Sequence, residues 1–194
     1  INKESFGELI DTFGGIRDIS KKIIVTPNEP NKTFSDDPLR MLRAVRFSSQ
    51  LKFNIAEKTK NSIKKNSERI KILSPERISD EINKILLTES PSIGFKNLER
   101  LNLLKFIIPE LIDLKGIEEV EGQTHKVNFY HTLEVLDNIS RNTDNLWLRW
   151  AALLHDIGKA PTKKFDKKIG WTFHGHEYVG SKMVKKIFKR LKSV

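Results

Sequence analysis

Histidine residues gather in the second half of the sequence, where they indicate a metal site. All five lie between His125 and His176. Histidine is the commonest neutral metal ligand, so this clustering is informative. The sharpest feature is the adjacent pair His155-Asp156, which follows the apolar stretch 150–154. An imidazole and a carboxylate at the end of a helix can turn toward one divalent cation, and we expect this pair to do so.

Four more side chains in the same region extend the candidate site. His131 lies on a preceding helix, as expected when antiparallel neighbouring helices contribute ligands across their interface. Lys159 follows the pair closely and can reach a substrate phosphate beside the cation. His174 and His176 are two residues apart, so a loop must hold at least His174. Such ligands suit Mn, Ni, Fe, Mg or Zn, and the spacing does not choose among these metals. Each histidine taken alone could equally be an ordinary hydrogen-bonded or surface side chain.

The charge of the chain favours a polyanionic partner. Lysine and arginine exceed the acids by 10 in 194 residues, and lysines crowd the stretch 163–192. Clustered cations gain affinity for nucleic acid by releasing phosphate counterions. The alternative is that these lysines only keep a helical surface soluble.

Composition excludes several classes of protein. The sequence holds no cysteine, which rules out disulfides and thiolate metal sites and favours a reducing cytoplasm. No apolar run approaches the roughly 18 residues of a membrane span, so no membrane partner is expected. The apolar fraction is 38% and the charged fraction 31%, which together favour a helical protein with much surface. Nothing in the sequence predicts an oligomeric state.

The periodicity of apolar residues is mainly helical. We expect a short strand over 21–25, a polar connector over 28–32, and a helix capped by Ser35 with Asp36 and Asp37 in its first turn. Further helices are expected from Ile55, from Pro75 after a Ser74 cap, and over 94–106, 130–139, 146–155 and 174–191. Gly158 and Pro161 should end the helix over 146–155, and residues 170–173 should form a loop or hairpin.

The histidine pattern resembles the HD superfamily of metal-dependent phosphohydrolases. The similar residues are His131, the segment 155–159 and the segment 173–177. In that family a first histidine, a His-Asp pair and a later aspartate bind a divalent cation. The resemblance assigns the first three ligands to His131, His155 and Asp156, and it expects the later aspartate beyond Val194. It implies phosphoester hydrolysis with His155, Asp156 and Lys159 in catalytic roles, and a second metal or a substrate phosphate at His174 and His176.

The first half resembles the class II tRNA nucleotidyltransferases and poly(A) polymerases. Three segments carry the resemblance: 11–18, 34–47, and 74–78 with the nearby Glu81, Ile85 and Leu86. The implied fold is mainly α. The resemblance implies that residues 1–33 form the trailing edge, partly β, of a nucleotidyltransferase head. It further implies a helical neck and body over 34–115 that selects nucleotides and binds RNA, and a helical HD-type domain over 116–194.

The same resemblance assigns a base-reading role at the start of the neck. In the family the second of two acids and an arginine three residues later bind the Watson–Crick edge of the incoming nucleotide. These roles fall on Asp37 and Arg40, while the first acid, usually glutamate, is here the shorter Asp36. Arg43 and Arg46 recur at helical spacing and are expected to reach the triphosphate or neighbouring carboxylates. The alternative is that Asp36 and Asp37 only satisfy a helix N-terminus while the arginines pair with acids.

A second set of charged residues is expected to be structural. Glu76, Arg77 and Glu81 lie in the later neck segment, and we expect them to form a salt-bridge network that braces the neck rather than to act as catalytic groups.

The implied activity is addition of CCA, or of A alone, to tRNA 3′ ends from CTP and ATP. Mg²⁺ would act in a head that we expect upstream of Ile1, because this chain shows neither the paired aspartates nor the glycine-rich loop of that head. We therefore expect a fragment that does not polymerise alone. Three alternatives stay open: a poly(A) polymerase, a stand-alone HD-type nucleotide phosphohydrolase, and a non-catalytic RNA-binding module with a degenerate HD site.

Overall fold

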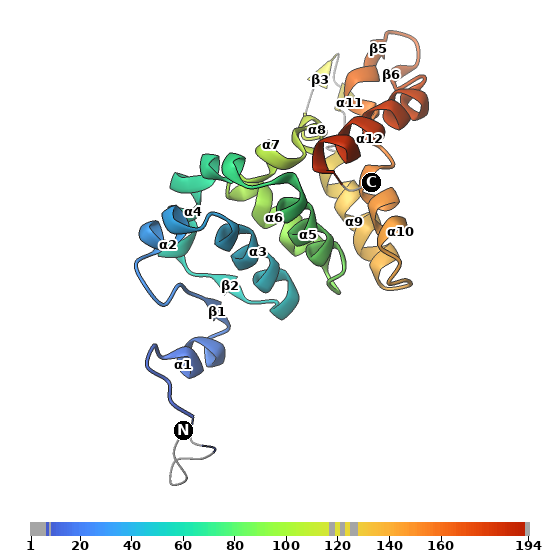
Figure 1. Cartoon of the computed structure of the whole chain (residues 1–194). Helices are drawn as coiled ribbons and strands as arrows, with labels where there is room; N and C mark the ends of the chain where they lie inside the picture. Colours follow the sequence, from blue (N-terminus) through green and yellow to red (C-terminus); the bar gives the residue numbers. More distant parts are fainter. Residues whose placement is uncertain (1–6, 8, 117–118, 121–122, 125–127, 193–194) are drawn as a thin grey trace.

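The computed structural model describes residues 7, 9–116, 119–120, 123–124 and 128–192, and these are mainly helical, as predicted. Figure 1 shows the chain passing from α1 near the N-terminus, through α2 to α8, to the group α9 to α12. Within the described residues the strands form three two-stranded pairs. None of the helices in this part of the chain combines the length and hydropathy of a membrane span.

The first helices and strands have boundaries that differ from the predicted ones near Pro30 and Pro38. They are α1 (Gly15–Ser20), β1 (Ile23–Ile24), α2 (Pro30–Asp36), α3 (Leu39–Leu51) and β2 (Asn54–Ile55). The predicted connector over 28–32 is wrong, because Pro30 occupies the first turn of α2 and the Glu29 side chain accepts from the Lys32 amide at 2.7 Å. Asp36 therefore lies in the last turn of a helix, not in the first.

The break between α2 and α3 follows from Pro38. Proline has no amide hydrogen, and it pushes the preceding residue toward extended backbone. Asp37 accordingly has φ −142° and ψ 99°, and α3 begins at Leu39. The predicted strand over 21–25 shortens to β1, which pairs in parallel with β2 and thereby holds the N-terminal segment against the end of α3.

The middle of the chain is a run of short helices. It comprises α4 (Glu57–Asn66), the 3₁₀ helix η1 (Ser67–Ile72), α5 (Pro75–Leu86), α6 (Pro91–Arg100), α7 (Leu104–Ile107) and α8 (Pro109–Asp113). The predicted Ser74 cap is confirmed, since its hydroxyl accepts from the Arg77 amide at 3.4 Å. The helix predicted over 94–106 is wrong at both ends: it begins at Pro91 and stops before Asn102, whose φ of 61° cannot continue a helix.

The last elements include the three predicted helices and the predicted hairpin, together with β3, β4 and α11, which were not predicted. They are β3 (Glu119–Val120), β4 (Gln123–Thr124), α9 (Asn128–Ser140), α10 (Leu146–Leu154), α11 (Lys159–Thr162), β5 (Lys164–Asp166), β6 (Gly170–Thr172) and α12 (His176–Leu191). The predicted hairpin is confirmed, with Phe165 opposite Trp171. Pro161 was expected to end α10, but α10 ends before His155 and Pro161 lies inside α11.

One hydrophobic core joins the two halves of the chain. Its buried side chains extend from Phe34 of α2 to Leu191 of α12. Helix α3 packs on α5 and α6, α9 packs on α6 and α10, and α12 packs on α5. The predicted boundary at 115–116 lies next to a connector that the structure describes only in part, and the division into 1–33, 34–115 and 116–194 remains a prediction.

A buried arginine reinforces the contact between the halves. The side chain of Arg149 on α10 is only 1% exposed. Its guanidinium donates to the carbonyls of Leu86 at 2.7 Å, Thr88 at 2.8 Å, Thr143 at 2.9 Å and Ser140 at 3.0 Å, and to the Asp144 carboxylate at 2.9 Å. Carbonyls at the end of a helix have no partner within that helix, so one cation satisfies the ends of both α5 and α9.

Replacing Arg149 with methionine should therefore destabilise the whole chain. The change keeps an apolar stem but leaves several carbonyls buried without donors, and we expect the free energy of unfolding to fall by about 3 kcal/mol. Urea unfolding followed by circular dichroism measures this loss. The exposed Arg141, at the end of α9, gives the matched control as Arg141→Met. Equal urea midpoints for the two variants would show that the buried guanidinium contributes nothing.

Candidate functional site

Three of the predicted metal ligands meet where α9 and α10 adjoin. His131 lies in the first turns of α9, His155 follows the last residue of α10, and Asp156 comes next. Their potential ligand atoms all lie within 4.8 Å of one another. The two imidazole rings are 6.1 Å apart, centroid to centroid. The packing of α9 on α10 thus brings together residues that are distant in sequence.

Hydrogen bonds hold two members of this group, His155 and Asp156, in place. The Nδ1 of His155 donates to the Ala152 carbonyl at 2.9 Å, which leaves the lone pair on Nε2. That Nε2 lies 3.2 Å from Oδ2 of Asp156, and the Lys159 ammonium donates to the same oxygen at 2.8 Å. Asp156 is only 4% exposed, and a buried carboxylate requires nearby positive charge. Two imidazoles and one carboxylate fit a divalent cation of the Mn, Fe, Ni or Zn type.

Gly158 lets α12 approach the loop that carries Asp156. A Cβ atom built on Gly158 would collide with the carbonyl of His176 and lie 2.7 Å from the amide of Gly180. Both neighbours are backbone atoms, which cannot rotate away. Only glycine therefore allows the start of α12 to lie directly against the loop that carries Asp156 and Lys159.

His174 and His176 lie beside Lys159 in a separate hollow. This hollow has a volume of about 580 Å³ and is lined by Lys159 and the segment 171–177. The Nδ1 of His176 donates to the Phe173 carbonyl at 2.9 Å, and His174 is exposed. The ligand group found among the described residues includes neither histidine. Their predicted role as metal ligands remains a prediction, whereas the alternative phosphate-binding role matches their position next to Lys159.

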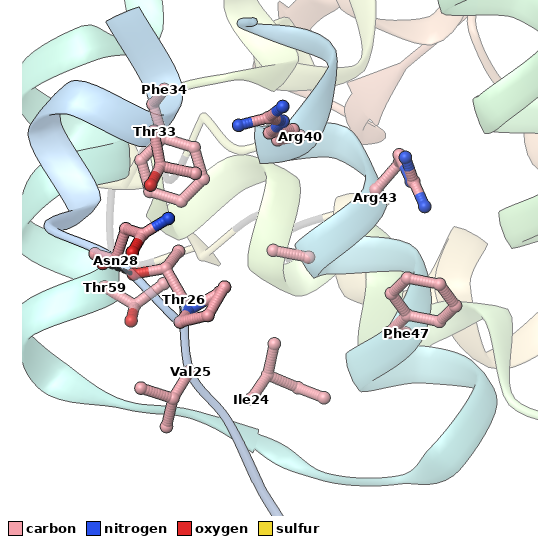
Figure 2. Close-up of a pocket in the computed structure, with 12 residues that line it drawn as sticks. Ile24, Val25, Thr26, Asn28, Thr33, Phe34, Arg40, Arg43, Phe47 and Thr59 are labelled. Carbon is pink, nitrogen blue, oxygen red and sulfur yellow. Dashed lines mark hydrogen bonds between the residues drawn. The ribbon is translucent and has the colours of Figure 1, made fainter. Parts of the chain in front are cut away.

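Two of the three predicted nucleotide-binding arginines, Arg40 and Arg43, border a second pocket, between α2, α3 and the segment that follows β1. Figure 2 shows Arg40, Arg43 and Phe47 in succession along α3, with Thr26 and Asn28 on the facing side. The pocket has a volume of about 400 Å³. It is therefore lined by two guanidinium groups, the rings of Phe34 and Phe47, and several polar side chains.

Asp37 lies at the start of α3, where it has three partners. Its Oδ1 accepts from the Leu39 amide at 3.1 Å, and its carboxylate lies 3.8 Å from the Arg40 guanidinium and 3.7 Å from that of Arg77. The alternative that Asp37 satisfies a helix N-terminus is thus partly correct, yet its side chain remains 33% exposed. Asp36 is exposed at the end of α2, and neither acid lines the pocket.

Arg46 departs from the predicted nucleotide-binding set. Its side chain is 16% exposed and lies 3.4 Å from Glu81, which is 5% exposed. It also lies 4.5 Å from the Phe47 ring. Of the two expectations for Arg46, contact with a neighbouring carboxylate is confirmed, while the pocket that Arg40 and Arg43 line does not include it. The pair Arg46–Glu81 braces α3 against α5, as predicted for Glu81.

Sequence reasoning missed some residues of both sites. Phe47 lies four residues after Arg43, so helical spacing alone could have placed it on the same face. The pairing of Arg77 with Asp37 and the place of Trp171 beside Lys159 depend on tertiary packing, for which no local pattern gives a signal.

Comparison with known proteins identifies two regions. Residues 52–114 match the family model described as the probable RNA and SrmB-binding site of polymerase A. Residues 128–194 match the HD domain. The predicted ligands His131, His155 and Asp156 lie in the second region, whereas Asp37 and Arg40 precede the first.

Curated relatives extend along nearly the whole chain. It is 36% identical over 199 residues to the multifunctional CCA protein of Shewanella frigidimarina, with 99% of this chain and 46% of that protein covered. It is 34% identical over 193 residues to the A-adding tRNA nucleotidyltransferase of Deinococcus radiodurans, with 95% and 44% covered. The chain thus spans about half the length of these relatives.

Solved structures support the fold. The Thermotoga maritima CCA-adding enzyme complexed with tRNA superposes with a TM-score of 0.60 at 22% identity, covering 97% of this chain and 40% of that chain. A tRNA-processing enzyme complex gives a TM-score of 0.62 at 22% identity, with 98% and 45% covered. At this level of identity the likeness shows a shared fold.

The geometry of the ligand group predicts that His155, and not His174, holds a cation. His155→Ala removes an oriented Nε2, and we expect the affinity for Mn²⁺ or Ni²⁺ to fall by at least about 100-fold, because even outer-shell partners are worth 10- to 100-fold. Isothermal titration calorimetry measures the change. His174→Ala is the matched control and should keep the parent affinity. A comparable loss in His174→Ala would instead support His174 as a ligand.

Proposed function

We propose that this chain, which belongs to the tRNA nucleotidyltransferase family of CCA-adding and A-adding enzymes, supplies base selection, RNA binding and an HD phosphohydrolase module. The whole protein would add CCA, or A alone, to tRNA 3′ ends from CTP and ATP. Its polymerising centre, with Mg²⁺, would lie in the part of the relatives that this chain does not span. The cytoplasm is the compartment that we expect.

Base selection is assigned to Asp37 and Arg40. A carboxylate accepts from an exocyclic amine, and a guanidinium donates to a ring nitrogen and a carbonyl. Cytosine and adenine both carry that amine, whereas guanine and uracil would leave polar groups unpaired. The single observation that supports this role best is the 3.8 Å separation of the two side chains at the start of α3, beside an open pocket. Arg43, which also lines the pocket, would bind the triphosphate.

RNA binding is assigned to the helical segment after α3. Its match to an RNA-binding family model and the net charge of +10 both favour a polyanionic partner. Lysines on α4 are part of this charge, with Lys58, Lys64 and Lys65 exposed. We propose tRNA as that partner.

Phosphoester hydrolysis is assigned to the HD region. A divalent cation held by His131, His155 and Asp156 would stabilise the negative charge of the phosphoryl group. The Ala152 carbonyl fixes the tautomer of His155, and Lys159, which also lines the adjoining hollow, holds Asp156 in place. His174 and His176 line that hollow and would bind the substrate phosphate.

A poly(A) polymerase is the second candidate function. The observation in its favour is the family model matched by residues 52–114, whose description refers to polymerase A. The two activities differ in the nucleotides they incorporate, so the same assay separates them. If the protein incorporates no nucleotide, a stand-alone HD phosphohydrolase remains as the candidate function.

Replacing Asp37 or Arg40 with alanine should reduce base selectivity in the complete protein. Each change removes one half of the base-reading pair, and we expect the preference for CTP and ATP over GTP and UTP to fall by roughly 10- to 100-fold. The measurement is incorporation of each nucleotide, supplied separately, on tRNA lacking its 3′ CCA.

Asp80→Ala gives the matched control, because Asp80 forms an exposed ion pair with Lys84 on the outer face of α5. Undiminished selectivity in both Asp37→Ala and Arg40→Ala would refute the base-reading role. Absence of incorporation by the folded parent protein would refute the polymerase function.

A further inference from the structure

The hollow beside the metal group combines two kinds of lining. The ammonium of Lys159 and the imidazoles of His174 and His176 line it, together with the carboxylate of Glu177, which lies 3.5 Å from Nε2 of His176. The indole of Trp171 and the ring of Phe173 contribute aromatic surface to the same hollow. Cations and N–H donors suit a phosphate, and aromatic rings suit another flat ring. The lining therefore matches a ligand that carries both a phosphate and an aromatic group.

The position of this hollow connects it to the ligand group. Lys159 donates to Asp156 at 2.8 Å while also lining the hollow. A phosphate held by Lys159 would thus lie next to the carboxylate that faces the cation. The volume of about 580 Å³ leaves space for more than a phosphate alone.

The β5–β6 hairpin holds Trp171 in place. Phe165 lies directly opposite in the strand register and packs against the indole with ring centroids 5.1 Å apart at 69°. The ammonium of Lys163 lies 4.4 Å from the centre of the indole. Gly170, with φ 81°, begins β6 directly after the turn at 167–169 and precedes Trp171. An aromatic side chain fixed in this way loses little conformational entropy when a ligand binds to it.

We propose that Trp171 is a specificity-determining residue of the HD site, which stacks on the base of a nucleotide whose phosphate is bound by Lys159 and His174. The proposal rests on the phosphohydrolase function proposed above for the metal group. It adds that the site distinguishes a nucleotide from a phosphate ester without a base. Base–aromatic stacking tolerates any base, so the site would select nucleotides as a class.

The test compares two ligands that share a phosphate and a ribose and differ in the base. Isothermal titration calorimetry measures the binding of AMP and of ribose 5-phosphate to the metal-free chain. In Trp171→Ala the affinity for AMP should fall by about tenfold, as expected for one lost stack, with ribose 5-phosphate unchanged. Trp171→Phe keeps a ring and should retain most of the AMP affinity.

Trp147→Ala is the matched control. Trp147 is 55% exposed on α10 and lines a different pocket, so its loss should leave both affinities unchanged. Equal weakening of both ligands in Trp171→Ala, or AMP binding no tighter than ribose 5-phosphate in the parent, would overturn the stacking role. Retained ribose 5-phosphate binding also shows that the variant is folded.

A second measurement separates this inference from the proposed hydrolysis. With Mn²⁺ or Ni²⁺ present, the ratio of kcat/KM for AMP to that for ribose 5-phosphate should fall by about tenfold in Trp171→Ala. Hydrolysis with an unchanged ratio refutes the role of Trp171 and leaves the phosphohydrolase intact. Selective loss of AMP binding without any hydrolysis by the complete parent protein refutes the phosphohydrolase and leaves the stacking role intact.

Discussion

A buried guanidinium must have partners for its donors, and this requirement fixes the arrangement of α5, α9 and α10. Arg149 meets it with oxygens at the ends of α5 and α9 and in the loop before α10. Next to it, the Trp150 indole donates to Asn83 of α5 at 2.8 Å. These directional bonds act together with the apolar core, which by itself would tolerate sliding of one helix along another. Helix α10, which ends just before His155, is therefore held in register with α5, which contacts Asp37 through Arg77.

Helix α5 is the element that both candidate sites share. Near its start, Arg77 approaches Asp37 and Glu81 pairs with Arg46, so α5 fixes the orientation of α3. At the C-terminal end of α5, the carbonyl of Leu86 accepts a hydrogen bond from Arg149. The C-terminal helix adds further ties, since Lys192 pairs with Glu76 at 3.0 Å. The pocket on α3 and the ligand group on α10 thus depend on one common support.

Local patterns predicted the parts of the structure that depend on neighbouring residues. The Ser74 cap, the hairpin and the meeting of His131 with the His-Asp pair follow from capping chemistry, turn residues and antiparallel packing. The start of α2 was mispredicted because both Pro30 and Pro38 can begin a helix, and sequence alone does not choose between them. Arg46 was predicted to lie on the same face of α3 as Arg40, but each step of three residues falls about 60° short of a full helical turn. After the two steps from Arg40, Arg46 lies about 120° around the helix. The pairing of Arg77 with Asp37 depends on packing between distant segments, which no local pattern encodes.

The continuous core has a mechanical consequence for any RNA that uses both sites. Side chains from α2 to α12 belong to one packed interior, so the base-reading segment and the metal group keep a constant separation. A hinge motion that brings the two halves of the chain closer together would require breaking that interior. Under the proposed function, an RNA 3′ end would therefore have to move from one site to the other, because the packed interior keeps each site in place.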